Sequence, residues 1–386
     1  MADDVKALLD RICGMISERI DRDRIATAKR RQAAAFAQDA GEWLPMSLGK
    51  SAPQVKELPS FDWRQQWHDP AKSLYMQLKN VVGGVAGPGD NVPGVRSDTG
   101  VINCMTIFGA GFDVPPHTKP IVTRYVPKEA LVDFEVPQDI SSLGIMPRVI
   151  EHMEHHKAVL AAAGLGDAIS VYHCDQQGPF DVAAQTRGHE MFTDMYEDPG
   201  FAHELMRKST DAYIAVSKLC KKINGEPLTS GNAVGYWIEN GGVRMCGDSD
   251  ILIGPELFRQ FVQPYQQRAF QAFGGGWLHY CGGARGYGRC EGLHLHELYA
   301  GIDGLRGLNW STAGDWLGQM RRLRALGVVH VGGLPREEGE TLEQYFRRAL
   351  GVYDERKGLI FHPEVKAGEH DRAMELWHEL QDERFN

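Results

Sequence analysis

The feature that most constrains this chain is a regular alternation between short apolar segments and longer amphipathic segments. From residue 92 onward, the two kinds alternate at about thirty residues per unit, which is typical of parallel β/α architecture. The candidate strands are Val92–Arg96, Gly100–Ile107, Ala168–Cys174, Leu228–Gly235, Trp277–Cys281, Asp303–Leu308, Val328–Val331 and Leu359–His362. The amphipathic candidates for helices are Pro199–Ile223, Pro255–Phe273, Thr312–Leu326, Leu342–Arg356 and His370–Gln381.

Candidate strands in this number and order predict an α/β fold, specifically a closed (β/α)8 TIM barrel. The start of the chain differs, because Val5–Gln38 is rich in Ala, Arg, Lys, Asp and Ile at helical spacing. We therefore expect residues 1–60 to form an N-terminal helical extension outside the barrel, and residues 61–386 to form the barrel domain. An open, doubly wound sheet is the main alternative. It is disfavoured because no Gly-x-Gly-x-x-Gly turn follows a strand, and Gly274–Gly276 and Gly282–Gly283 have the wrong spacing.

Composition excludes several classes of protein. Apolar residues make up 42% of the 386 residues and charged residues 24%, so the chain can bury a core. The net charge of -9 and the lack of a large basic cluster argue against a nucleic-acid partner. With neither a secretory signal nor a run of about 18 apolar residues, we expect a soluble, cytoplasmic protein with no membrane partner. The seven cysteines are scattered, which predicts reduced thiols.

The ends of the candidate strands are unusually polar, and reactive groups of a parallel barrel lie where strands end. Histidine and cysteine suit zinc as ligands. Residues i and i+2 of a strand face the same side, so His279 and Cys281 can reach one metal ion. The paired spacing of a structural zinc site is missing, which favours a catalytic site with an open position. The alternative is two half-buried barrel residues without a metal.

Further polar residues near strand ends are candidates for the site. His173 and Asp175 are candidate acid/base groups, or alternatively part of a hydrogen-bonded layer above the barrel. Asp250 is a candidate substrate-binding acid, or part of a helix cap. Glu239 is a candidate on a loop over the site, or part of a solvated turn.

A group of histidines falls outside these strand ends. His152, His155 and His156 lie on one helix face beside Glu151 and Glu154, and we expect this face to be exposed to solvent.

An ordered series of motifs resembles the uroporphyrinogen decarboxylase superfamily from about Asp69 to the C-terminus. The motifs are Gly178-Pro179-Phe180 through Arg187-Gly188, Met191-Phe192-Thr193-Asp194-Met195-Tyr196-Glu197-Asp198-Pro199, Gly254-Pro255-Glu256-Leu257-Phe258, Phe261-Val262-Gln263-Pro264-Tyr265 and Leu278-His279-Tyr280-Cys281-Gly282. The resemblance implies a TIM barrel that is often dimeric.

The resemblance implies one of two chemistries. Heme-pathway decarboxylases carry an N-terminal Arg-Gln-Ala-Gly-Arg-Tyr stretch that grips substrate carboxylates, whereas this chain has Arg31-Gln32-Ala33-Ala34-Ala35-Phe36 and lacks the second arginine. The methylcobamide:thiol methyltransferases carry His-x-Cys on the fifth strand and a second Cys about eighty residues later, and these groups bind zinc. His279 and Cys281 match that pattern. The last cysteine here is Cys290, and His362 stands near the place of the third ligand.

The sequence thus predicts an enzyme of this superfamily outside the heme-making branch, which transfers a methyl group from a corrinoid protein or small methylated donor to a thiol. Zinc is expected on His279, Cys281 and His362, with His330 and Cys174 as reserve third ligands. Asp175 and His173 are the expected catalytic residues, and the expected substrate-binding residues are Tyr236, Asn309, Glu239 and Asp250. We expect a small-molecule substrate and a homodimer. The alternatives are a decarboxylase or carbon–carbon lyase for a small carboxylated substrate, and a non-catalytic binding barrel.

Overall fold

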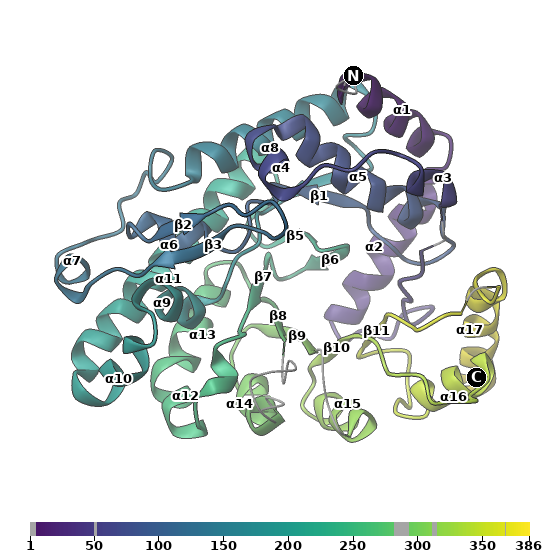
Figure 1. The fold of residues 1–386 in the computed structure, drawn as a ribbon. Coiled ribbons are helices and arrows are strands. Elements are labelled where there is room, and N and C mark those ends of the chain that lie inside the picture. The colour runs from purple at the N-terminus through teal and green to yellow at the C-terminus, as the bar shows by residue number, and fades with distance from the viewer. Residues whose placement is uncertain (1–4, 50–51, 282–292, 311–314, 367) are drawn as a thin grey trace.

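The central feature of the fold is a parallel sheet of five strands in the order β11–β10–β9–β8–β7. The structure is a computed structural model that describes residues 5–49, 52–281, 293–310, 315–366 and 368–386. The five strands are β7 (Val243–Cys246), β8 (Gly276–Tyr280), β9 (Leu305–Trp310), β10 (Val329–Gly332) and β11 (Leu359–Phe361). A second parallel pair joins β1 (Gly94–Arg96) to β4 (Ser170–Tyr172). Helices surround the strands (Figure 1).

One isolated bridge connects these two sheets, and a second joins the segment around Met46 to β11. Gln177, just beyond β4, bridges Cys246 of β7, and Met46 bridges Phe361 of β11. The Asp90 amide donates to the Met46 carbonyl over 2.8 Å, which brings the Met46 segment beside the chain that enters β1. The seven parallel strands therefore follow the order of a TIM barrel, with the Met46 segment in the place of an eighth strand. This is the fold class predicted from the sequence.

One predicted strand is a helix, a second is a strand outside the barrel sheet, and one barrel strand was missed. The segment Gly100–Ile107 contains helix α6 (Asn103–Ile107), whose five residues are all buried, and periodicity cannot separate a short buried helix from a buried strand. The segment Leu228–Gly235 contributes β5 (Ser230–Ala233), which pairs antiparallel with β6 (Tyr236–Glu239). Strand β7 was missed because Arg244 interrupts its short apolar run.

Helices fill the connections between the barrel strands. After β1 they are α6, α7 (Lys128–Val132), α8 (Met146–Ala162), α9 (Pro179–Arg187), α10 (Glu190–Glu197), α11 (Pro199–Asn224), the 3-10 helix η1 (Asp250–Leu252), α12 (Pro255–Phe261), α13 (Gln263–Gln271), η2 (Leu293–Leu295), α14 (His296–Ala300), α15 (Trp316–Ala325), α16 (Leu342–Leu350) and α17 (His370–Phe385). A small hairpin of β2 (Gly111–Asp113) and β3 (Ile121–Arg124) stands apart from the barrel sheet. Within the described residues, every helix is too short or too polar to cross a membrane.

The N-terminal segment reaches into the barrel as well as around it. Its helices are α1 (Val5–Ser17), α2 (Arg22–Phe36) and α3 (Pro53–Lys56), followed by α4 (Trp63–His68) and α5 (Pro70–Ala86). Helix α1 packs on α5, whereas α2 packs on β6. Phe36 joins an inner apolar cluster with Trp277 and Val329, and a Cβ at Gly307 would lie 2.8 Å from its ring. The expectation that residues 1–60 lie wholly outside the barrel is therefore wrong for α2, and the domain boundary near residue 60 stays a prediction.

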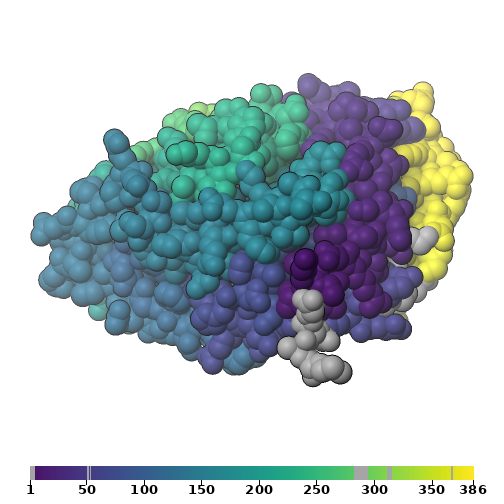
Figure 2. All heavy atoms as spheres, turned by 90° about the horizontal axis from the view of Figure 1, so that it is seen from above, coloured from purple at the N-terminus to yellow at the C-terminus, as the bar shows by residue number. Residues whose placement is uncertain are grey.

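The first and last parts of the chain lie side by side. Figure 2 shows the purple N-terminal segment against the yellow C-terminal one. Trp377 of α17 donates to the Leu44 carbonyl over 2.8 Å, and the Leu44 amide donates to Gln381 over 2.7 Å. These bonds hold the strand-like segment around Met46 in its place beside β11.

The β5–β6 hairpin closes the amino end of the barrel. Asn232 donates to the Val92 and Pro93 carbonyls, both over 3.2 Å, and Gln32 of α2 accepts from the Trp237 amide over 2.6 Å. With this end occupied by α2 and the hairpin, a substrate site is left to the carboxyl ends of the strands.

The histidine cluster on α8 is mostly buried, so the expectation that it is exposed is wrong. His152 and His156 are 1% and 0% exposed, and His155 is half-buried. Burial lowers the pKa of His152 to about 4 and holds that of His156 well below its ordinary value. The two imidazoles are therefore neutral in the folded protein near pH 7, and their rings lie 5.9 Å apart.

These histidines predict that the protein loses stability in mild acid. Between about pH 6.5 and pH 4, His152 is protonated in the unfolded chain but stays neutral in the folded chain. The free energy of unfolding therefore falls as the pH drops through this range. The slope is up to about 1.4 kcal/mol per pH unit for each such histidine. Urea unfolding from pH 8 to pH 5 should show a smaller slope for His152→Leu than for wild type. The exposed-site variant His117→Ala should keep the wild-type slope, and equal slopes in all three proteins would contradict the prediction.

Candidate metal centre and cavity

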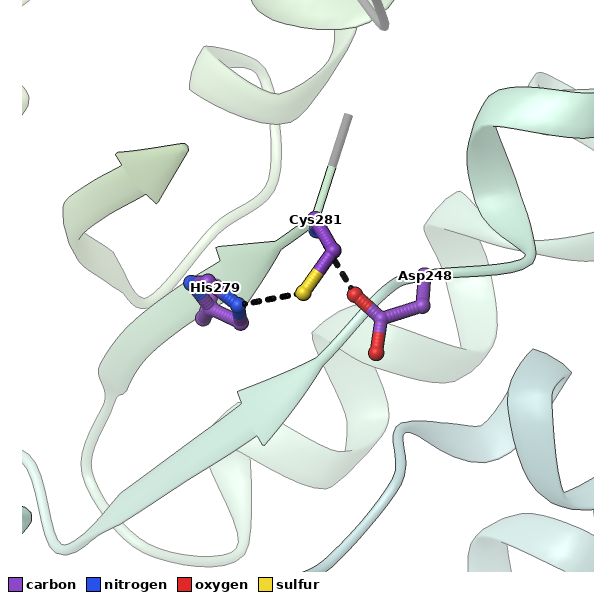
Figure 3. Close-up of side chains that lie close together, drawn as sticks. All are labelled: Asp248, His279 and Cys281. Carbon is purple, nitrogen blue, oxygen red and sulfur yellow. Dashed lines mark hydrogen bonds between the residues drawn. The ribbon is translucent and has the colours of Figure 1, made fainter. Parts of the chain in front are cut away.

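Three potential metal ligands converge at the carboxyl ends of β7 and β8. Because alternate residues of a strand share a side, Trp277, His279 and Cys281 project from β8 in one row. His279 Nε2 lies 3.0 Å from Cys281 Sγ, and Asp248 accepts from the Cys281 amide over 2.7 Å. One ligand atom from each of the three residues lies within 4.8 Å of the others. Figure 3 shows Asp248 and Cys281 approaching from the two strand ends.

Asn309 fixes the chemical state of His279. The Asn309 amide nitrogen donates to the Val331 carbonyl, so its oxygen faces His279 Nδ1 and accepts from it. A proton on Nδ1 leaves Nε2 as the nitrogen with a free lone pair, directed at Cys281. Burial lowers the pKa of His279, and nearby Arg244 lowers it further. The imidazole is therefore neutral, and the lone pair of its Nε2 is oriented toward Cys281, as binding to a metal ion requires.

Buried carboxyl groups support the loop that carries Asp248. Asp181 accepts from the Asp248 amide over 2.9 Å and from the Ser249 amide over 2.6 Å. Burial raises the pKa of Asp181 well above its ordinary value, with Asp248 adding to the effect. Asp250 accepts from Gln266 over 2.6 Å and is fully buried, and burial raises its pKa to about 7. These contacts fix the loop after β7 on its buried side.

A cavity of about 440 Å³ opens beside these ligands. It is lined by Val234, Tyr236, Arg244, Trp277, His279, Asn309, Gly332, Gly333, His362, Pro363 and Glu364. The predicted site residues Tyr236, His279, Asn309 and His362 are thus brought together. Asp250 lies behind the loop, and Glu239 lies at the opposite end of the barrel, at the end of β6 and before β7 begins.

His173 and Asp175 lie in the barrel interior. Asp175 pairs with Arg96 over 2.9 Å and with Arg244 over 2.8 Å. Burial opposes ionisation of Asp175, but the two guanidinium groups outweigh it and hold the pKa down to about 2. Burial lowers the pKa of His173 to about 4. Near pH 7 the pair is therefore a fixed anion beside a neutral imidazole, and their catalytic role stays a prediction.

The reserve third ligands face away from His279. His330 is buried, and its Nε2 lies 2.9 Å from the Gly333 carbonyl, while Cys174 Sγ lies 3.8 Å from Cys220 Sγ. The Gly282–Gly283 turn and Cys290 lie outside the described residues.

Sequence reasoning missed the interior arginines and the place of Asp248. An arginine inside the short apolar run Val243–Cys246 was the available signal, because a strand tolerates such a charge only beside a partner or a cavity.

The comparisons with known proteins agree with this architecture. The family model for uroporphyrinogen decarboxylase (URO-D) matches residues 99–364. The chain belongs to the uroporphyrinogen decarboxylase family. This confirms the resemblance seen in the sequence motifs. No curated protein matches this URO-D family chain.

One solved structure similar to this URO-D family chain is a methyltransferase from Methanosarcina mazei. The two share 16% sequence identity with a TM-score of 0.63, over 92% of this chain and 98% of the other. At this identity the likeness supports the fold alone.

The interior ion pairs predict a large cost for removing the central carboxylate. Asp175→Asn leaves Arg96 and Arg244 buried without their shared anion, so the free energy of unfolding should fall by about 3 kcal/mol or more. Asp382→Asn removes the partner of Arg356 at a half-exposed site and should cost less than about 1 kcal/mol. Chemical denaturation of both variants tests this, and a cost for Asp175→Asn no larger than that for Asp382→Asn would contradict the prediction.

Proposed function

We propose that this protein is a metal-dependent methyltransferase in which zinc binds at the carboxyl ends of β7 and β8. The observation that carries the proposal is the group of Asp248, His279 and Cys281, whose ligand atoms lie within 4.8 Å of one another beside a cavity. Carboxylate, imidazole and thiolate together form a normal zinc donor set, and three protein ligands leave a fourth position for substrate. When bound, zinc would lower the pKa of a substrate thiol, which would release its proton to solvent. The thiolate sulfur would then form the new bond to the methyl group, while the donor would leave with the electron pair of the bond that breaks.

The donor groups fit a metal by observations other than their number. His279 is held neutral, with Nε2 as the free nitrogen, by its contact with Asn309. Cys281 is exposed at the end of β8, so a substrate can approach it. The Asp248 loop is fixed by Asp181, which limits how far the carboxylate can move. These are the supports that metal sites receive from surrounding residues.

The chain's own residues would bind and orient the substrate. The cavity is of the size that takes a small molecule. Its wall carries Tyr236 and Trp277, whose rings lie 5.5 Å apart in an edge-to-face arrangement, and these rings would exclude water from the bound substrate. Asn309 would keep His279 oriented throughout the reaction, because its amide is itself anchored on β10.

The third metal ligand is proposed to be Asp248. His362, the choice from the sequence, lines the same cavity but is not part of the three-residue group. Asp248 already contacts the Cys281 amide and needs little movement to direct an oxygen at the metal. The prediction from the sequence that His362 is the third ligand is the alternative to Asp248, and the variants below decide between the two residues.

A decarboxylase or lyase for a small carboxylated substrate is the second candidate. Arg244 in the cavity wall favours it, because a guanidinium binds a carboxylate well. A non-catalytic barrel is the third candidate, although a neutral, oriented histidine beside an exposed thiol is an unusual feature to retain without chemistry. A corrinoid protein as methyl donor, a homodimer and a cytoplasmic location remain predictions from the sequence.

Metal analysis of variants tests the proposal. Protein purified without chelator should contain about one zinc per chain, since three such ligands bind zinc stably. Cys281→Ser and Asp248→Ala should lose most of the metal, whereas His362→Ala should keep it. Cys13→Ser, on α1 and far from the site, is the matched control and should keep it as well.

The same proteins are then assayed for thiol methylation with methylcobalamin as donor. Wild type and Cys13→Ser should be active, and Cys281→Ser should be inactive. Full zinc in Cys281→Ser would overturn the metal site, and zinc loss in His362→Ala with retention in Asp248→Ala would reverse the choice of third ligand. A zinc-loaded wild type without methyl transfer would favour the lyase candidate.

A further inference from the structure

The floor of the cavity, toward the amino ends of the strands, combines apolar and aromatic side chains with one arginine. Arg244 and Trp277 pair across β7 and β8, one inward-facing layer below Cys246 and His279. The hairpin residues Val234 and Tyr236 complete this layer. The floor is therefore apolar and aromatic except for one guanidinium.

The guanidinium of Arg244 has more N–H donors than the acceptors described around it can satisfy. Its side chain is 10% exposed, and Nη1 donates to Asp175 over 2.8 Å. The guanidinium carbon lies 5.5 Å from the centre of a Trp277 ring, and Nε has no hydrogen-bond partner among the described residues. A guanidinium has five N–H donors, so one carboxylate oxygen does not satisfy it.

The network behind Arg244 does not balance its charge. Asp175 is shared with Arg96, and Asp98 is shared by Arg96 over 3.3 Å and Lys119 over 3.0 Å. In this described network three cations thus face two carboxylates.

Two further carboxylates lie above the floor, and neither forms an ion pair with Arg244 among the described residues, although the charge of Asp248 helps to raise the pKa of Arg244. Asp248, at the mouth, accepts from the Cys281 amide, and Glu364, exposed at the rim, accepts from the Arg336 amide over 3.3 Å. Among the described residues, Asp175 is the carboxylate that pairs directly with Arg244, so the remaining N–H donors of Arg244 can bind an anionic ligand.

We propose that Arg244 anchors a carboxylate-binding subsite on the cavity floor. A planar carboxylate matches the fork of a guanidinium, and the Trp277 ring holds that fork in place. The inward layers of Trp277 and His279 are two strand residues apart, roughly 7 Å. The ligand is therefore a short carboxylic acid whose other end reaches His279 and Cys281. That this other end is the methyl-accepting thiol rests on the proposed function, whereas the subsite itself does not.

Binding of two small isosteres tests the subsite. Propionate and its neutral amide, propionamide, are titrated into the full chain by calorimetry. Wild type should bind propionate at least about tenfold more tightly, as a charge-assisted hydrogen bond gives. Arg244→Gln should remove this preference, and Arg244→Lys, which keeps the charge but loses the fork, should fall between. Arg259→Gln, an exposed residue of α12, should bind as wild type does.

The following binding results would contradict the proposal. Equal binding of the two isosteres by wild type, or an undiminished preference in Arg244→Lys and Arg244→Gln, would overturn it. Tighter binding of ethanesulfonate than of propionate would overturn the choice of a carboxylate. Neither isostere carries a thiol, and the titration is repeated after chelation, so failure of the metal site or of methyl transfer would leave this result unchanged.

Discussion

The row of inward side chains along β8 is the constraint on which the rest of this structure depends. A barrel strand alternates its side chains, so Trp277, His279 and Cys281 must line the interior at increasing height. Parallel pairing then fixes their neighbours, because Arg244 lies beside Trp277, and Cys246 and Asn309 lie beside His279. The register of β8 with its two neighbours therefore decides which residues form the cavity floor, which lie at the metal ligands and which lie at the cavity mouth.

Side chains fill the barrel at the amino ends of its strands, and the cavity lies toward their carboxyl ends. Phe36 from α2 occupies the space that Gly307 leaves, and the hairpin tip at Val234 covers the amino end. Val234 has φ +56, a left-handed conformation that costs a β-branched residue energy. The next residue, Gly235, is held on both sides, because its amide donates to Asn232 and its carbonyl accepts from Gln32. The remaining cavity carries the polar chemistry.

The sequence predicted the barrel and the His279–Cys281 pair because both depend on local patterns. Alternation gives the fold class, and i, i+2 spacing gives a shared strand face. It did not predict β7 or the place of Asp248, because pairing between distant segments decides them. Arg244 is stable within β7 only because Asp175 lies opposite it, and Asp248 meets Cys281 only after β7 and β8 align. Buried His152 and His156 looked exposed for the same reason, since α8 is covered by elements far away in the chain.

The central claim is that Asp248, His279 and Cys281 hold one metal ion. X-ray absorption at the zinc edge on the zinc-loaded protein tests it most directly, because the spectrum counts sulfur and lighter ligands separately. The account predicts one sulfur at about 2.3 Å and two or three nitrogen or oxygen ligands at about 2.0–2.1 Å. A shell without sulfur, or one with several sulfurs, would contradict it.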